Sequence, residues 1–319
     1  MPINIPSNLP AFKTLKDESI FVMSAERALT QDIRALKIAI VNLMPTKIET
    51  ETQLLRLLSN TPLQADITLI KTSTYVPKHA SYEHMATFYK TFGDVKGEKF
   101  DALVITGAPV EKMDFLDVVY WEELCEMLEW SKSHAFSVMH ICWGAQAGLY
   151  YHYGINKREL PRKLSGIYPQ RPAVNNHPLL KGFDEVFYVP QSRYTEIKPE
   201  DIEKSGSLTV LAGSPVSGAH IIADKTNRQI FITGHGEYDR ETLKNEYLRD
   251  KERGLNPEIP YNYFPDDDPE KEPIYTWRGH ASLMYSNWLN FCVYQETPFD
   301  LNNLKELEID RNASRLSSM

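Results

Sequence analysis

Short, continuous runs of apolar residues recur through the first half of the chain. They lie at residues 36–43 (LKIAIVNL), 66–70 (DITLI), 101–106 (DALVIT) and 135–141 (AFSVMHI). Apolar runs of this length, without alternation, are typical of parallel strands that are covered on both faces. We therefore predict four buried strands in this half.

Segments with helical spacing of apolar residues lie between and after these runs. They cover residues 48–58, 116–131 and 144–153. Residues 75–99 are aromatic, polar and weakly periodic, which predicts a loop with some helix. Alternation of strands and helices indicates βαβ units on a parallel sheet.

The second half has shorter strand-like runs, punctuated by Gly, Pro, Asn and Asp. We predict strands at 186–189, 208–212, 219–223 and 229–233, helices at 240–253 and 280–294, and a surface loop at 261–273. We expect residues 1–34 to form an irregular arm and residues 300–319 to form a polar tail. Without repeats or a clear linker, the prediction is one domain over residues 1–319, of the α/β class, with a mostly parallel central sheet flanked by helices.

Composition narrows the class of protein. The 319 residues are 42% hydrophobic and 24% charged, with a net charge of −8, which argues against a nucleic-acid partner. The three cysteines include no CxxC pair, so we expect free thiols in a reducing compartment and no structural zinc. With no signal-peptide pattern and no membrane-spanning run, the prediction is a cytoplasmic protein without membrane contact.

The sharpest motif is HICWGAQAG at residues 140–148. A buried strand runs into Cys142, and a helix follows at once, as in a nucleophile elbow. The helix N-terminus stabilises a thiolate, and its first amide, that of Trp143, can stabilise an oxyanion. Cys125 and Cys292 lie inside helical patterns and are expected to be inert.

A second motif, GHGE, follows the apolar run at residues 229–233. Strand ends are where catalytic groups collect on such sheets. His235 can act as the base for Cys142, and Glu237 can fix its tautomer. A solvated turn histidine is the alternative for His235 alone. His140 is compatible either with the site or with the core, and the other histidines share no ligand spacing.

These residues resemble the class I glutamine amidotransferase fold, although that superfamily often has glycine where His140 stands. Over nearly the whole chain the sequence is similar to the amidotransferase-like homoserine acyltransferase family of bacterial methionine synthesis. The matching segments are MPINIPSNLPA, AIVNLMPTKIETETQLLRLL, LVITGAPVE, HICWGAQAGLYY, GHGEYD and WRGH.

The resemblance implies a ping-pong reaction between an acyl-coenzyme A and L-homoserine. Cys142 takes the acyl group, and His235, oriented by Glu237, activates the homoserine hydroxyl. It also implies an oxyanion role for Lys47, a homoserine carboxylate contact for Arg249, and substrate contacts for two further residues, Lys163 and Ser192. For each of these a surface or helix ion-pair role is the alternative. The basic run at 157–163 could also meet coenzyme A phosphates.

The position of Glu111 is the one the resemblance links to the acyl donor. Succinyl carries a free carboxylate that a buried glutamate would repel, so we expect acetyl-coenzyme A as co-substrate and no further cofactor. A helix N-terminal acid is the alternative for this residue. The other functions left open are a succinyltransferase, a glutaminase or cysteine hydrolase, and a binding module. Base rates and the family favour a homodimer.

Overall fold

The computed structural model describes residues 3–4, 22–23, 34–74 and 82–309. Most of the arm predicted at residues 1–34 lies outside these ranges. Within it, β1 (Ile3–Asn4) pairs in parallel with β2 (Val22–Met23).

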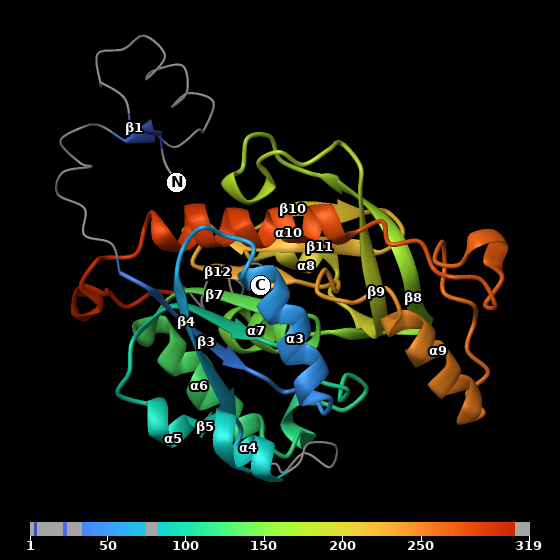
Figure 1. Ribbon diagram of the computed structural model, residues 1–319, viewed down its shortest axis with the longest axis horizontal. Helices are drawn as coiled ribbons and strands as arrows, with labels where there is room; N and C mark the ends of the chain where they lie inside the picture. Colours follow the sequence, from blue (N-terminus) through green and yellow to red (C-terminus); the bar gives the residue numbers. More distant parts are fainter. Residues whose placement is uncertain (1–2, 5–21, 24–33, 75–81, 310–319) are drawn as a thin grey trace.

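A ten-stranded sheet forms the centre of the molecule (Figure 1). In spatial order its strands are β5 (Tyr89–Thr91), β4 (Ala65–Lys71), β3 (Leu36–Val41), β6 (Phe100–Ile105), β7 (Ala135–Ile141), β12 (Gln229–Ile232), β11 (Gly218–Asp224), β10 (Leu208–Ser214), β8 (Arg158–Pro172) and β9 (Phe187–Glu196). Neighbours from β5 to β12 are parallel, and those from β12 to β9 are antiparallel. The parallel half confirms the strands predicted from continuous apolar runs.

Helices cover both faces of the parallel half. On one face, α3 (Lys47–Leu58) and α10 (Arg278–Asn287) pack over β3, β6 and β7. On the other, α6 (Trp121–His134) and α7 (Trp143–Tyr153) cover the same strands. The remaining helices are α4 (Tyr82–Phe88), α5 (Phe92–Val95), α8 (Pro199–Lys204) and α9 (Thr242–Glu252), with 3-10 turns at Phe115–Asp117, Pro178–Leu180, Pro265–Asp267 and Leu301–Asn303. None of the helices in the described ranges is long and apolar enough to cross a membrane.

Alternate residues of one strand enter opposite cores, which explains why the strands are apolar throughout. In β3, Ile38 and Ile40 pack in the core beneath α3 and α10, while Ala39 and Val41 pack in the core beneath α6 and α7. All four side chains are at most 1% exposed. A strand buried on both faces has no position for a polar side chain, so its period of two disappears from the sequence.

Strand β8 was not predicted. Its sequence RELPRKLSGIYPQRP is polar and contains three prolines, which usually argue against a strand. Pro161 falls in an irregularity of the β8–β9 register between Glu159 and Leu164, and β10 joins β8 only at Arg171 and Pro172. The strand predicted at 186–189 is correspondingly longer in the structure.

Three other predictions need correction. Residues 82–95 form α4 and α5, which agree with the helix expected there, and also strand β5, which was not predicted. The helix predicted at 280–294 is α-helical only to Asn287, and Trp288–Tyr294 forms a π-helix. The tail predicted from residue 300 is not wholly polar surface: Leu304 and Leu307 are buried, and residues 310–319 lie outside the described ranges.

Candidate active site

Cys142 occupies the turn between β7 and α7, at φ 51° and ψ −114°. Its N–H donates to the carbonyl of Ile232 on β12 at 2.7 Å, and its carbonyl accepts from Gln146 N at 3.1 Å. Gly144 follows two residues later, where a Cβ would lie 2.6 Å from the carbonyl oxygen of Thr106. A glycine is therefore needed to let the helix start this close to the end of β6.

His235 lies just beyond β12, the strand that neighbours β7. Its N–H donates to Pro190 O at 2.9 Å, which ties the loop to β9. The ring Nδ1 lies 2.6 Å from Glu237 Oε1, and the ring stacks on Tyr238 with 4.2 Å between centroids. The carboxylate and the stacked ring hold the imidazole in one orientation, which is the contact that the third member of a triad would make.

The electrostatics favour a charged His235. Burial alone would lower the pKa of His235, but charge interactions and hydrogen bonds with Cys142 and Glu237 raise it well above 6.5. A protonated His235 beside Cys142 places a positive charge and a proton donor next to the sulfur. Cys292 has no such partner and is buried, which raises the pKa of that thiol to about 12. This contrast agrees with the predicted inert role of Cys292.

A cavity of about 530 Å³ opens over this pair. The residues in its wall that were singled out from the sequence are Cys142, His235, Glu111, Lys163, Ser192 and Arg249. They come from the loop after β6, the turn after β7, strands β8 and β9, the GHGE loop and α9. The fold therefore brings together segments more than a hundred residues apart. Glu237 lies behind His235, outside this wall.

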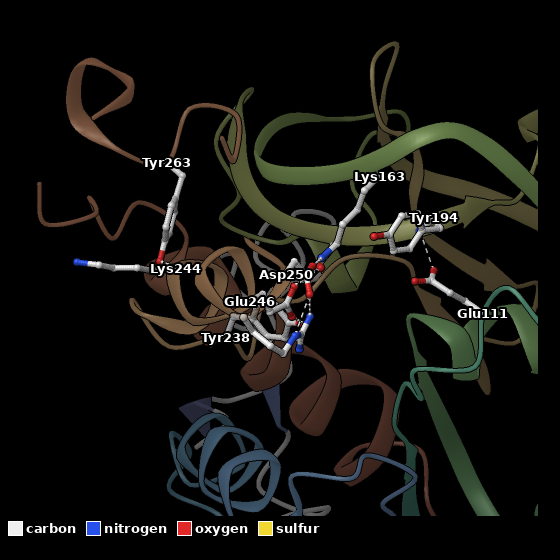
Figure 2. A network of polar contacts seen from close by, with 10 residues as sticks. Glu111, Lys163, Tyr194, Tyr238, Lys244, Glu246, Asp250 and Tyr263 are labelled. Carbon is white, nitrogen blue, oxygen red and sulfur yellow. Dashed lines mark hydrogen bonds and ion pairs between the residues drawn. The ribbon is translucent and has the colours of Figure 1, made fainter. Parts of the chain in front are cut away.

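A polar network centred on Glu246 of α9 lies on one side of the cavity (Figure 2). Its carboxylate accepts from Lys163 Nζ at 3.3 Å, from Tyr238 Oη at 2.9 Å and from the Ser192 hydroxyl. Asp250, one turn on, accepts from Lys163 Nζ at 3.0 Å and is paired with Arg249. The helix ion pair that was the alternative for Arg249 is therefore present, and it lies in the cavity wall.

Glu111 lies across the cavity from this network, at the loop after β6 (Figure 2). Its Oε2 accepts from Tyr194 N at 2.9 Å, so the carboxylate is held against β9. Burial raises the pKa of Glu111, although the Tyr194 N–H and nearby cations oppose this. Lys157 Nζ binds the carbonyls of Glu111 and Met113 and holds the loop from outside.

Lys47 is placed differently from its predicted role. Its ammonium is buried, donates to the carbonyl of Asn42 and lies over the ring of Tyr89, outside the cavity wall. Burial lowers the pKa of Lys47 to about 8. Lys47 thus supports the loop that follows β3, whose residues Met44 and Thr46 line the cavity.

The structure also places Trp143 and His140. The Trp143 side chain is fully buried against Phe115 and Tyr120, so only its main-chain amide, the first of α7, is a candidate for the oxyanion. His140 is a core residue: its Nε2 contacts Gln229 Oε1 at 2.8 Å, and its ring stacks on Phe231.

The basic run at 157–163 does not supply free cations. Lys157 holds the Glu111 loop, Arg158 pairs with Glu196, and Arg162 pairs with Glu258 at 3.0 Å. Lys163 belongs to the network of Glu246. The suggestion that this run meets coenzyme A phosphates is therefore not supported by its contacts.

Sequence reasoning missed Glu246, Asp250 and Tyr238. A signal existed in α9 and its C-terminal cap, where the residues that line the cavity are Thr242, Asn245, Glu246, Arg249, Asp250 and Arg253. Their spacing of three and four residues marks one helical face. This face is polar, so hydrophobic periodicity could not reveal it. No group of three or more His, Cys, Asp or Glu side chains in the described ranges is arranged to hold a metal ion.

Comparison with solved structures identifies the fold. A solved glutamine amidotransferase from Thermotoga maritima matches with a TM-score of 0.51 and 12% identity, covering 81% of this chain and 99% of that one. At this identity the likeness concerns the fold alone. It confirms the predicted class I glutamine amidotransferase-like α/β architecture.

Sequence relatives are much closer. The homoserine O-acetyltransferase of Acetivibrio thermocellus is 58% identical over 305 residues, which cover 96% of this chain and 100% of the relative. That of Thermotoga petrophila is 58% identical over 304 residues, covering 95% and 100%. The profile of the homoserine O-succinyltransferase family matches residues 2–299, so the chain belongs to this family of acyltransferases.

Proposed function

We propose that this enzyme transfers an acetyl group from acetyl-coenzyme A to the hydroxyl of L-homoserine, giving O-acetyl-L-homoserine for methionine synthesis. The observation that carries the proposal is the buried Cys142–His235–Glu237 arrangement, which opens into a cavity that also contains Glu111. The relatives at 58% identity named homoserine O-acetyltransferase support the choice of acyl acceptor and donor.

Two half-reactions follow from these groups. The Cys142 thiolate attacks the thioester carbonyl, the Trp143 amide stabilises the oxyanion, and coenzyme A leaves as its C–S bond breaks. The departing thiolate takes the proton from His235. Neutral His235 then accepts the hydroxyl proton of homoserine as that oxygen attacks the acyl-Cys142 carbonyl, and the Cys142 thiolate is released beside the imidazolium again.

Homoserine would bind against the Glu246 network. Arg249 contacts Asp250 through Nε and Nη2, so we expect the substrate carboxylate at Nη1, as a charge-assisted contact. Lys163 and Ser192 lie beside Glu246 and complete a polar surface for the amino-acid end.

Glu111 would exclude succinyl-coenzyme A. Its carboxylate lies in the cavity wall and is partly buried, so the free carboxylate of a succinyl group would meet like charge with little water to screen it. Glu111→Gly is expected to raise kcat/KM for succinyl-coenzyme A at least about tenfold relative to acetyl-coenzyme A, the factor for 1.4 kcal/mol. Glu111→Gln, measured alongside, separates charge from size. If the glycine variant keeps the original preference, the argument on Glu111 fails.

The test of the whole proposal is intact mass after brief mixing with acetyl-coenzyme A in the absence of homoserine. A gain of one acetyl group, lost in Cys142→Ser and discharged by L-homoserine, is the expected result. An adduct with succinyl-coenzyme A alone would establish the succinyltransferase instead. No adduct with either donor would favour a glutaminase or a binding module on this fold.

We also propose that the enzyme acts in the cytoplasm as a homodimer, with acetyl-coenzyme A as co-substrate and no other cofactor. A symmetric dimer is the commonest form of closed oligomer. Light scattering of the purified protein decides its mass, and full activity after treatment with a chelator supports the absence of a metal requirement.

A further inference from the structure

The mouth of the cavity carries two cations that are not neutralised. Lys112, next to Glu111, and Arg253, at the end of α9, both line the cavity and are exposed. Neither forms an ion pair with an acid of the described ranges, whereas Lys163 and Arg249, which also line the cavity, are both paired with Asp250. Lys112 and Arg253 thus differ from these two cations in lacking a carboxylate partner.

Apolar surface is exposed beside Lys112 and Arg253. Met113 follows Lys112 and is 39% exposed, and Leu255 lies near Arg253 and is 59% exposed; both line the cavity. Lys112 Nζ lies 3.9 Å from the centre of the Tyr194 ring, which holds the ammonium at the cavity rather than away from it. Each cation therefore has an apolar neighbour on its own side of the mouth.

Acidic groups restrict where an anion can bind. Glu49 on α3 also lines the cavity and is exposed, and Glu111, Glu246 and Asp250 lie deeper. An anionic ligand would avoid the α3 side. The favourable position is the side formed by the loop after β6 and the end of α9.

We propose that Lys112 and Arg253 bind the phosphate groups of the nucleotide end of the acyl thioester, while Met113 and Leu255 contact its apolar parts. This assignment rests on the proposed function and names the part of the site that holds the donor. The cations paired with Asp250 remain for the amino acid, so the two substrates would be recognised by different residues.

The test compares two donors, acetyl-coenzyme A and S-acetyl-N-acetylcysteamine, which has the thioester without phosphates. For Lys112→Ala and Arg253→Ala we expect KM for acetyl-coenzyme A to rise about fivefold each, as exposed charge contacts allow. kcat/KM for the truncated donor and KM for homoserine should stay unchanged. Lys204→Ala, on α8 and outside the cavity, is the matched control.

A second measurement is independent of turnover. Adenosine 3′,5′-bisphosphate should bind the wild type in calorimetry, more weakly at high salt, and at least fivefold more weakly to the double variant. Wild-type protein that uses neither thioester would refute the proposed function. Wild-type protein that uses both, with variants impaired equally toward both or toward neither, would refute the phosphate assignment alone.

Discussion

Two residues after Cys142, the main chain leaves no room for a side chain. A Cβ at Gly144 would lie 2.6 Å from Thr106 O and 2.8 Å from Ile105 O. Because both neighbours are backbone atoms, Gly144→Ala must move α7 or β6, and we expect unfolding free energy to fall by about 1–3 kcal/mol with a large loss of acylation. Gly279→Ala, in α10 with nothing within 4 Å, is the control and should stabilise by about 0.4–1 kcal/mol. Urea unfolding measures both, and equal effects would refute the explanation.

Lys47 should make stability depend on alkaline pH. Burial lowers its pKa from 10.5 to about 8. Between these values the unfolded state holds the proton and the folded state does not, so stability rises with pH through this window. Relative to Lys47→Met, the wild type should gain up to about 3 kcal/mol of unfolding free energy from pH 8 to 10.5. A difference that stays flat over this range would show that Lys47 is not desolvated in solution.

At the residue scale, the local sequence was enough to single out residues that directly follow a predicted strand. Cys142, His235 and Glu237 follow apolar runs directly, so their neighbours in sequence set their surroundings. Glu246 could not be found this way, because its role depends on how α9 faces β8 and β9. Lys47 was singled out from the sequence, but its place at the start of α3 directs its side chain toward Asn42 and Tyr89 instead of the cavity.

At the scale of the element, β9 separates a cavity side from a buried side. Ser192 and Tyr194 line the cavity, while Gln191, Arg193 and Thr195 are at most 2% exposed. The Arg193 guanidinium donates to Thr195 O at 2.8 Å and to Ser217 O at 2.5 Å, which clamps β9 to the turn before β11. Strand β9 therefore depends on a buried cation for its position.

Arg193→Met should destabilise the enzyme by about 3 kcal/mol, because it leaves buried carbonyl groups without donors. Arg158→Met is the matched control: its side chain is 53% exposed and pairs with Glu196, so the expected loss is below about 1 kcal/mol. Chemical denaturation of both variants checks the difference. Similar losses would mean that the clamp contributes little.

Strand β8 shows what element prediction could not supply. Its partner β9 begins after a 14-residue connection, and Pro161 lies in a register irregularity that nothing in the local sequence reveals. Gly166 of β8, at φ 137°, is also explained by a distant segment, because a Cβ there would lie 2.3 Å from the backbone of Tyr261. Pairing partners, rather than propensity, determine this strand.

At the scale of the whole molecule, Arg34 joins distant parts of the chain. Its Nη1 and Nη2 each lie 2.7 Å from Asp101, which is fully buried, and its Nε donates to Phe299 O at 2.7 Å. Asp101→Asn should lower the unfolding free energy by about 2 kcal/mol, since Arg34 loses its counter-charge. Asp66→Asn, exposed on β4, is the control. Calorimetric melting that finds both variants equal would exclude this role.

Sheet order could be predicted only in part. The βαβ pattern predicted the parallel half, but not that β12, some ninety residues after β7, lies beside it. That adjacency brings His235 to Cys142, because the N–H of Cys142 bonds to the end of β12. The change from parallel to antiparallel pairing begins at the same strand.

The backbone of Cys142 has a consequence for any effort to evolve this enzyme. A φ of 51° with ψ of −114° suits glycine, and a side chain there costs about 1–3 kcal/mol. A library screened only for heat resistance would therefore enrich glycine at position 142, and we expect these glycine variants to be inactive. Selection for growth without methionine keeps the cysteine. We expect the two selections to favour different residues at position 142, glycine for heat resistance and cysteine for growth. Such a difference would support the role of Cys142 as nucleophile.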